Sequence, residues 1–136
     1  MSSRYVVDSF AWIAFLQKEP NWETVQEFFR QADRGTVSLY MSLINFGEIV
    51  YLVERRLGLP AAHQFLGKAK VAPIELVPAT YQRVIEAAHI KASYPMSYAD
   101  AFATALAQEF DATILTGDPE FRAVEHLIEL HWLDDC

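Results

Sequence analysis

The sequence predicts an α/β domain with a central, mainly parallel β-sheet. Short runs of apolar and β-branched residues alternate along the chain with longer segments of helical periodicity, which is the order of a parallel sheet with crossover helices. The apolar runs show little polar alternation, as in strands that are buried on both faces. We therefore expect helices to cover the sheet on both sides.

The first part of the chain predicts one strand and two helices. Residues 4–8 (RYVVD) form a β-branched and aromatic run typical of a strand, and residues 9–19 (SFAWIAFLQKE) continue at helical spacing. Asn21 is placed to cap a second helix over 22–34, because apolar residues recur there at the i, i+3, i+4 and i+7 spacing.

The next part repeats the strand and helix order. Residues 36–42 (TVSLYMS) predict a strand. A helix over 43–57 follows, with an apolar stripe on one face, and we expect Gly58 and Pro60 to end it. Residues 60–70 predict a shorter helix.

The remaining part predicts three strands, two helices and a helical turn. Residues 74–79 (IELVPA) read as a strand, and 79–93 as a helix that stops before Pro95. An alanine-rich helix is expected over 97–110. The chain then closes with a strand, a helical turn and a final strand, at 112–117 (ATILTG), 118–124 (DPEFRAV) and 127–133 (LIELHWL).

Length and composition fit one compact domain over residues 1–136, since 52% of the residues are hydrophobic and no low-complexity linker or repeat interrupts them. The single cysteine, Cys136, leaves no disulfide framework or thiolate zinc site and favours a reducing, cytoplasmic setting. The early apolar stretch contains Asp8 and lacks a cleavage site, so we expect no signal peptide. No apolar segment reaches the ~18 residues of a membrane span.

Four acidic residues stand out, and each has a structural explanation when taken alone. Asp8 and Asp118 each follow a strand where a helical segment must begin, so both could be N-caps. Asp100 follows Ser97 at the S-x-x-D spacing of a capping box. Glu48 lies off the apolar stripe of its helix, as a solvated glutamate does.

Taken together, the same acids indicate a metal site. In an open parallel sheet the carboxyl ends of the strands and the helix starts after them lie along one edge, where ligands bind. Asp8 and Asp118 belong to that edge by position, and Asp100 opens a helix that can face it. No Lys or Arg adjoins Asp8 or Asp100 in sequence, so a divalent cation is the expected compensation. Oxygen ligands favour Mg²⁺ or Mn²⁺ over zinc.

Other chemistries find little support in the sequence. There is no nucleophile elbow, phosphate-binding P-loop or dinucleotide-binding motif, and the histidines lack metal-ligand spacing. A receiver-type signalling domain would need paired acids after the first strand, and a haloacid-dehalogenase phosphatase would need D-x-D there, where Phe10 stands. The net charge of −7 means that any affinity for a polyanion must be local.

Three segments, VVDSFAWIAFL, GEIVYLVERR and YADAFATALAQEFDATILTGDPEF, resemble the PIN-domain family, and specifically the VapC toxins of toxin–antitoxin pairs. The resemblance implies a PIN-like α/β/α sandwich with a central, mainly parallel sheet. It also implies an Mg²⁺- or Mn²⁺-dependent endoribonuclease with RNA as its substrate, a cognate antitoxin and a homodimeric state. The family's acidic quartet falls on Asp8, Glu48, Asp100 and Asp118, with Thr116 as a hydroxyl neighbour.

Several roles stay open. A non-catalytic metal- or RNA-binding module is an alternative to the nuclease. Asp118 can both start its helical turn and face the metal, and Gly117 is expected to let the chain turn tightly. Basic residues could contact phosphate or be solvated: Arg55, Arg56, Lys68, Lys70 and Arg122. Large aromatics in the first two helices could fill the core or line a groove for an antitoxin or a second copy: Trp12, Phe15, Trp22, Phe28 and Phe29.

Overall fold

The computed structural model of the chain describes residues 3–134. Its sheet has five strands, all parallel, in the order β3-β2-β1-β4-β5. The strands are β1 (Ser3–Val7), β2 (Val37–Ser42), β3 (Glu75–Val77), β4 (Thr113–Thr116) and β5 (Leu130–Trp132). The predicted parallel α/β architecture is confirmed.

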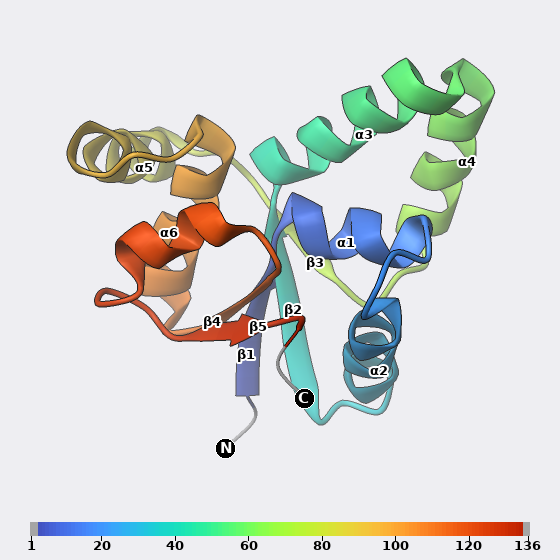
Figure 1. Ribbon diagram of the computed structural model, residues 1–136, viewed down its shortest axis with the longest axis horizontal. Helices are drawn as coiled ribbons and strands as arrows, with labels where there is room; N and C mark the ends of the chain where they lie inside the picture. The colour runs from blue at the N-terminus through green and yellow to red at the C-terminus, as the bar shows by residue number, and fades with distance from the viewer. Residues whose placement is uncertain (1–2, 135–136) are drawn as a thin grey trace.

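Helices lie on both sides of this sheet (Figure 1). They are α1 (Ser9–Leu16), α2 (Trp22–Asp33), α3 (Leu43–Leu57), α4 (Leu59–Ala69), α5 (Tyr81–Ser93), α6 (Tyr98–Phe110) and a 3₁₀ helix, η1 (Pro119–Val124). Each corresponds to a segment predicted from periodicity, with ends that shift by a few residues. No helix among residues 3–134 is long and apolar enough to cross a membrane.

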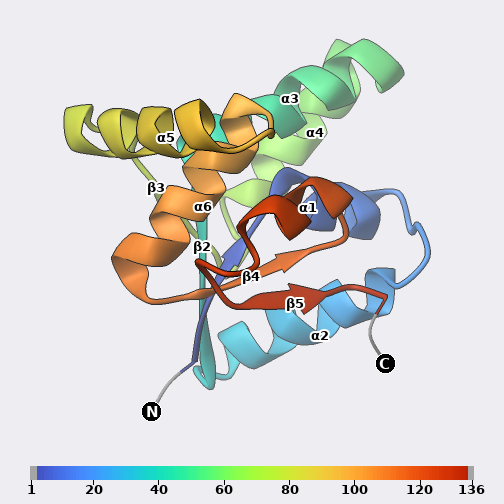
Figure 2. The ribbon, with the colours of Figure 1, turned by 60° about the vertical axis from the view of Figure 1, so that its left-hand side comes forward.

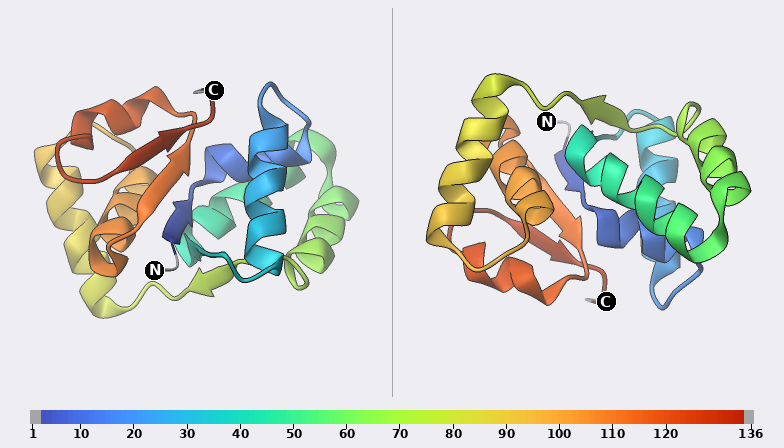
Figure 3. Two further views of the ribbon diagram at one scale, coloured as in Figure 1. Left: turned by 90° about the horizontal axis from the view of Figure 1, so that it is seen from below. Right: turned by 90° about the horizontal axis from the view of Figure 1, so that it is seen from above.

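Alternating side chains of the central strands divide the interior into two cores. Val7 and Leu115 pack into a core with α1, α2, α3 and α4, whereas Val6 and Ile114 pack into the other with α5, α6 and η1. Figures 2 and 3 show the strands between these two layers. Burial on both faces explains why the strand sequences lack polar alternation.

The large aromatics of the first two helices belong mainly to the core. Trp12, Phe28 and Phe29 are buried, and Phe15 is partly buried against them. Trp12 contacts Phe29 with ring centroids 5.9 Å apart, and Phe15 contacts the same ring at 5.1 Å. Core packing is therefore the role of these rings, and Trp22, which is half-buried, contacts Phe15.

Two local expectations differ from the structure. Asn21 precedes α2 but has a left-handed backbone, with φ of 72°, and its side chain makes no capping hydrogen bond. Leu57, expected on the apolar stripe of α3, is 62% exposed, because the helix ends there and Gly58 turns the chain with φ of 95°. Buried contacts of α3 come instead from Ile49 and Val53.

The connections place a switch point between β1 and β4. The helices that follow β1 and β2 cover one face of the sheet, and those that follow β3 and β4 cover the other. β1 and β4 are neighbours, with Val7 opposite Leu115, so the chain leaves their carboxyl ends in opposite directions. Such a point is where parallel α/β sheets bind ligands.

Candidate metal centre

Asp8 lies directly at this switch point and is almost fully buried. One carboxylate oxygen, Oδ1, accepts a hydrogen bond of 2.8 Å from the backbone N–H of Ala11 and so caps α1. The other oxygen, Oδ2, accepts a hydrogen bond of 2.5 Å from the hydroxyl of Thr116, the last residue of β4. The capping role expected for Asp8 is present, and each oxygen still has a lone pair for a cation.

Thr116 links Asp8 to the loop after β4. Its hydroxyl donates to Asp8 and accepts a hydrogen bond of 2.9 Å from the backbone N–H of Asp118. Since Thr116 is fully buried and both its donor and acceptor functions are used, the hydroxyl has one orientation. Asp8 and Asp118 are therefore held in fixed relation through a single side chain.

Asp100 does not complete the capping box that its spacing predicts. Its backbone N–H donates to the Ser97 hydroxyl at 3.1 Å, so the serine half of the motif is present. The reciprocal acceptor for the Ser97 N–H is Glu120, whose Oε1 lies 3.0 Å away. Glu120 thus caps α6 from another part of the chain, and this leaves the buried carboxylate of Asp100 available to the site.

Asp100, Asp118 and Glu120 form a compact group of carboxylates. One oxygen from each lies within 4.8 Å of the others, close enough to share one cation. Asp118 also accepts a 2.9 Å hydrogen bond from the N–H of Glu120 and caps η1. Glu120 was not among the four acids predicted for the site. The one feature of the sequence that could have indicated Glu120 is its position two residues after Asp118, at the start of η1.

The carboxylates raise one another's pKa. The pKa of Asp100 is raised to about 9, chiefly by burial and then by the negative charges of Asp118 and Asp8. Burial also raises the pKa of Asp8 to about 7, although the hydrogen bonds from Thr116 and Ala11 act in the opposite direction. Ion pairs among residues 3–134 join Arg34 to Glu27 and Arg83 to Glu109, and neither pair reaches this group.

Glu48 lies at the margin of the site. It is half-buried on α3, and its charge contributes to the raised pKa of Asp8, but its oxygens are outside the compact group. Asn45, one turn earlier, is fully buried; its Nδ2 donates to the Ser9 hydroxyl at 3.3 Å, and that hydroxyl donates to the Asn45 carbonyl at 3.1 Å. The start of α3 is therefore fastened to the residue after Asp8.

Gly117 has a different role from the one expected. Its φ is not in the left-handed region, so the turn after β4 does not itself require glycine. A Cβ at this position would overlap Cε1 of Phe10 and would lie 3.0 Å from Cδ1 and 3.1 Å from Cζ. In this structure the Phe10 ring occupies the space that a side chain at position 117 would take.

The donor set fits Mg²⁺ or Mn²⁺. Every candidate ligand is a carboxylate oxygen, the preference of these hard cations, and histidine and cysteine are absent from the compact group. Besides burial, the charges of Asp118 and Asp8 raise the pKa of Asp100, and those of Asp118 and Glu48 raise the pKa of Asp8, so negative groups lie near one another here. A divalent cation would remove that repulsion.

The predicted phosphate-contacting residues lie outside this group. The guanidinium of Arg122 lies over the Trp132 ring at 4.9 Å and that of Arg55 over the Tyr51 ring at 5.2 Å. Arg56, Lys68 and Lys70 are exposed.

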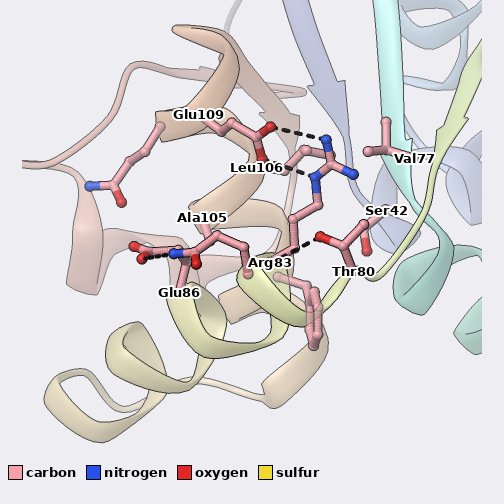
Figure 4. A pocket seen from close by; sticks show the side chains of 11 residues that line it. Ser42, Val77, Thr80, Arg83, Glu86, Ala105, Leu106 and Glu109 are labelled. Atoms are coloured by element: carbon pink, nitrogen blue, oxygen red, sulfur yellow. Dashed lines mark hydrogen bonds and ion pairs between the residues drawn. The ribbon is translucent and has the colours of Figure 1, made fainter.

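A separate cavity of about 530 Å³ lies between α5 and α6 (Figure 4). Its wall includes the bidentate pair in which Arg83 donates to both oxygens of Glu109, at 3.0 Å each. None of the five acids described above lines it. The group of acids and this cavity are therefore separate features of the molecule.

The fold and the acids together define a class of protein, an α/β/α domain with an all-carboxylate site at the switch point of a parallel sheet. The chain belongs to the PIN domain family, whose model matches residues 5–127. No curated protein sequence matches the chain.

Solved structures share the fold at low sequence identity. A DNA-bound VapBC from Salmonella typhimurium has a TM-score of 0.73 at 16% identity, over 96% of this chain and 98% of that one. VapC20 of Mycobacterium tuberculosis, a sarcin–ricin-loop-cleaving toxin, has a TM-score of 0.71 at 18% identity, over 88% and 94%. A toxin–antitoxin complex from Klebsiella pneumoniae has a TM-score of 0.70 at 11% identity, over 97% and 99%.

Proposed function

We propose that the protein is a divalent-metal-dependent endoribonuclease and the toxin of a toxin–antitoxin pair. The observation that carries the proposal is the convergence of Asp8, Asp100, Asp118 and Glu120 at the switch point, with no basic partner among the described residues. Membership of the PIN domain family supports it. The toxin–antitoxin assignment draws on the names of proteins that share the fold.

In this proposal the acidic residues bind the cation and Thr116 positions two of them. Asp100, Asp118 and Glu120 would hold Mg²⁺ or Mn²⁺, and Asp8 and Glu48 would face the same ion or its water shell. When bound, the ion would supply an activated water and charge neutralisation at an RNA phosphodiester. Thr116 keeps Asp8 and Asp118 in register, and Glu120 keeps the start of α6 folded while it adds its charge.

Cleavage of RNA by the purified chain tests the nuclease. We expect cleavage with Mg²⁺ or Mn²⁺, none in EDTA, and a loss of at least about a hundredfold in Asp100→Asn and Asp8→Asn, since each removes a ligand charge at nearly constant shape. Asp33→Asn, an exposed aspartate at the end of α2, is the matched control and should keep full activity. Full activity of Asp100→Asn would contradict the assignment.

Partners are tested separately. A toxin should be neutralised by a small protein encoded beside it, and that protein should co-purify with the chain. Sizing of the isolated chain tests the predicted homodimer. A monomer that cleaves RNA and ignores the neighbouring gene product would leave the nuclease in place and refute the toxin.

A further inference from the structure

An exposed aromatic ring stands beside the carboxylates. Phe10 lies in the first turn of α1, two residues after Asp8, and is 43% exposed. It belongs to neither of the two cores. One side of the ring lies against Gly117, the residue before Asp118, where a Cβ would collide with it. Phe10 is therefore seated between the two segments that supply Asp8 and Asp118, with part of its surface open to solvent.

This seating distinguishes Phe10 from an ordinary exposed side chain. Single apolar residues on a surface are common and need no explanation. Here, however, the ring occupies the space that a Cβ at position 117 would take, so a side chain there would displace the ring, although the φ of Gly117 does not demand glycine.

Because the site is negatively charged, a nucleic acid would gain affinity there from contacts that do not depend on positive charge, such as stacking on an aromatic ring. Within residues 3–134 the acidic group forms no ion pair with Lys or Arg, so the positive charge in direct contact with these carboxylates would be that of the proposed cation. Stacking of a base on an aromatic ring gives affinity that does not depend on positive charge. A base in a duplex has both faces covered by its neighbours, whereas an unpaired base has a free face.

Building on the proposed ribonuclease function, we infer that Phe10 is a substrate-binding residue that stacks on an unpaired nucleobase next to the scissile phosphate. Gly117 is the positioning residue that gives the ring its place.

Fluorescence anisotropy with labelled oligoadenylate, oligouridylate and their duplex, in EDTA so that the probes are not cleaved, is the first test. We expect the wild type to prefer oligoadenylate, the better stacking partner, and to bind the duplex weakly. Phe10→Ala should weaken oligoadenylate binding about tenfold and lose the preference over oligouridylate, while Phe10→Trp should keep both. Tyr81→Ala is the matched control, since Tyr81 is 82% exposed at the start of α5, near the Arg83–Glu109 pair at the far end of α6.

A double-mutant cycle with Gly117 is the sharper test. Gly117→Ala should displace the ring and weaken oligoadenylate binding although Phe10 is still present. In the Phe10→Ala background the same change should have little effect, because nothing remains for the new Cβ to strike. Melting with and without Mn²⁺ checks the metal site, and the rise caused by Mn²⁺ should be the same in Phe10→Ala as in the wild type.

The possible outcomes distinguish failure of the stacking role of Phe10 from failure of the proposed ribonuclease function. A wild type that cleaves RNA while Phe10→Ala keeps its oligoadenylate affinity and its kcat/KM would overturn the inference and leave the ribonuclease standing. Loss of self-association or of a protein partner in Phe10→Ala, with RNA binding unchanged, would also overturn it. A wild type that binds oligoadenylate through Phe10 but cleaves no RNA would support stacking and contradict the ribonuclease.

Discussion

At the scale of single residues, Asp100 and Glu120 have different roles: Glu120 caps α6, and the carboxyl group of Asp100 is left available to the site. Glu120 accepts the hydrogen bond that a capping-box aspartate would have taken from the Ser97 N–H. Asp100 therefore has a buried carboxyl group that its own helix does not use, and the pKa of this group is raised to about 9, chiefly by burial. Ionisation of this group is unfavourable in the metal-free fold and becomes favourable when a cation binds.

The first prediction concerns Asp100→Asn. In EDTA at neutral pH we expect this variant to melt at or above the wild type, because the amide avoids the cost of burying a carboxyl group among other acids. With Mg²⁺ or Mn²⁺ the order should reverse, since the wild type gains RT ln(1 + [L]/Kd), ~2.7 kcal/mol at a hundredfold excess over Kd. Thermal melts of both proteins in both buffers check this. Equal destabilisation in both buffers would make Asp100 a purely structural residue.

The proximity of most of these acids could be predicted from the sequence, because the strand ends of a parallel sheet and the helix starts that follow them lie along one edge. Asp8, Asp100 and Asp118 were predicted in this way, and their mutual effects on pKa place them together. Glu120 was missed, since its role depends on a contact with Ser97 that is 23 residues away in the chain. The reason for Gly117 was also missed, because only the fold brings Phe10 against it.

At the scale of elements, the beginnings of α1 and α3 are fastened together. The Ser9 hydroxyl donates to the carbonyl of Asn45 and accepts from its side-chain amide, and all these groups are buried. The Asn45 Oδ1 has no hydrogen-bond partner within the described part of the chain. This pair fixes the turn of α3 that precedes Glu48 against the segment that contains Asp8.

The second prediction follows from that pair. Asn45→Ala should lower the free energy of unfolding by about 1–3 kcal/mol, because it removes one buried hydrogen bond and leaves a small cavity. The loss is limited by the Ser9 hydroxyl, which can still donate to the backbone carbonyl at position 45. Urea unfolding measures the change. Tyr51→Ala, an exposed residue of the same helix, is the control and should change stability far less.

Periodicity predicted the elements well because each helix buries one face against a sheet that is itself buried. The pattern was weakest where a local conformation overrides composition. Asn21 was predicted to cap α2, yet its backbone is left-handed and its side chain makes no capping hydrogen bond. The final strand was expected over 127–133, but only Leu130–Trp132 pairs with β4. These features depend on turns and on neighbours that are distant in sequence.

At the scale of the whole molecule, the switch point concentrates negative charge on a chain that is already acidic, with a net charge of −7. The folded, metal-free protein keeps protons on Asp8 up to about pH 7 and on Asp100 up to about pH 9, whereas the unfolded chain releases them near 3.8. Over this range the folded state binds more protons. The stability of the metal-free protein must therefore depend on pH through these two groups.

The last prediction is the direction of that dependence. Because the folded state holds the extra protons, the contribution of Asp100 to the free energy of unfolding should fall as pH rises from 3.8 to about 9. The difference in the free energy of unfolding between the wild type and Asp100→Asn in EDTA isolates the contribution of Asp100, since the other titrating groups are common to both proteins. With excess Mn²⁺ the slope should reverse, because the cation binds only the deprotonated carboxylates and protons compete with it at low pH. Urea unfolding at several pH values, with EDTA and with Mn²⁺, measures both slopes. A difference between the two proteins that is constant across pH in EDTA would show that Asp100 does not titrate between the folded and unfolded states, and that the acids do not converge as a charged site.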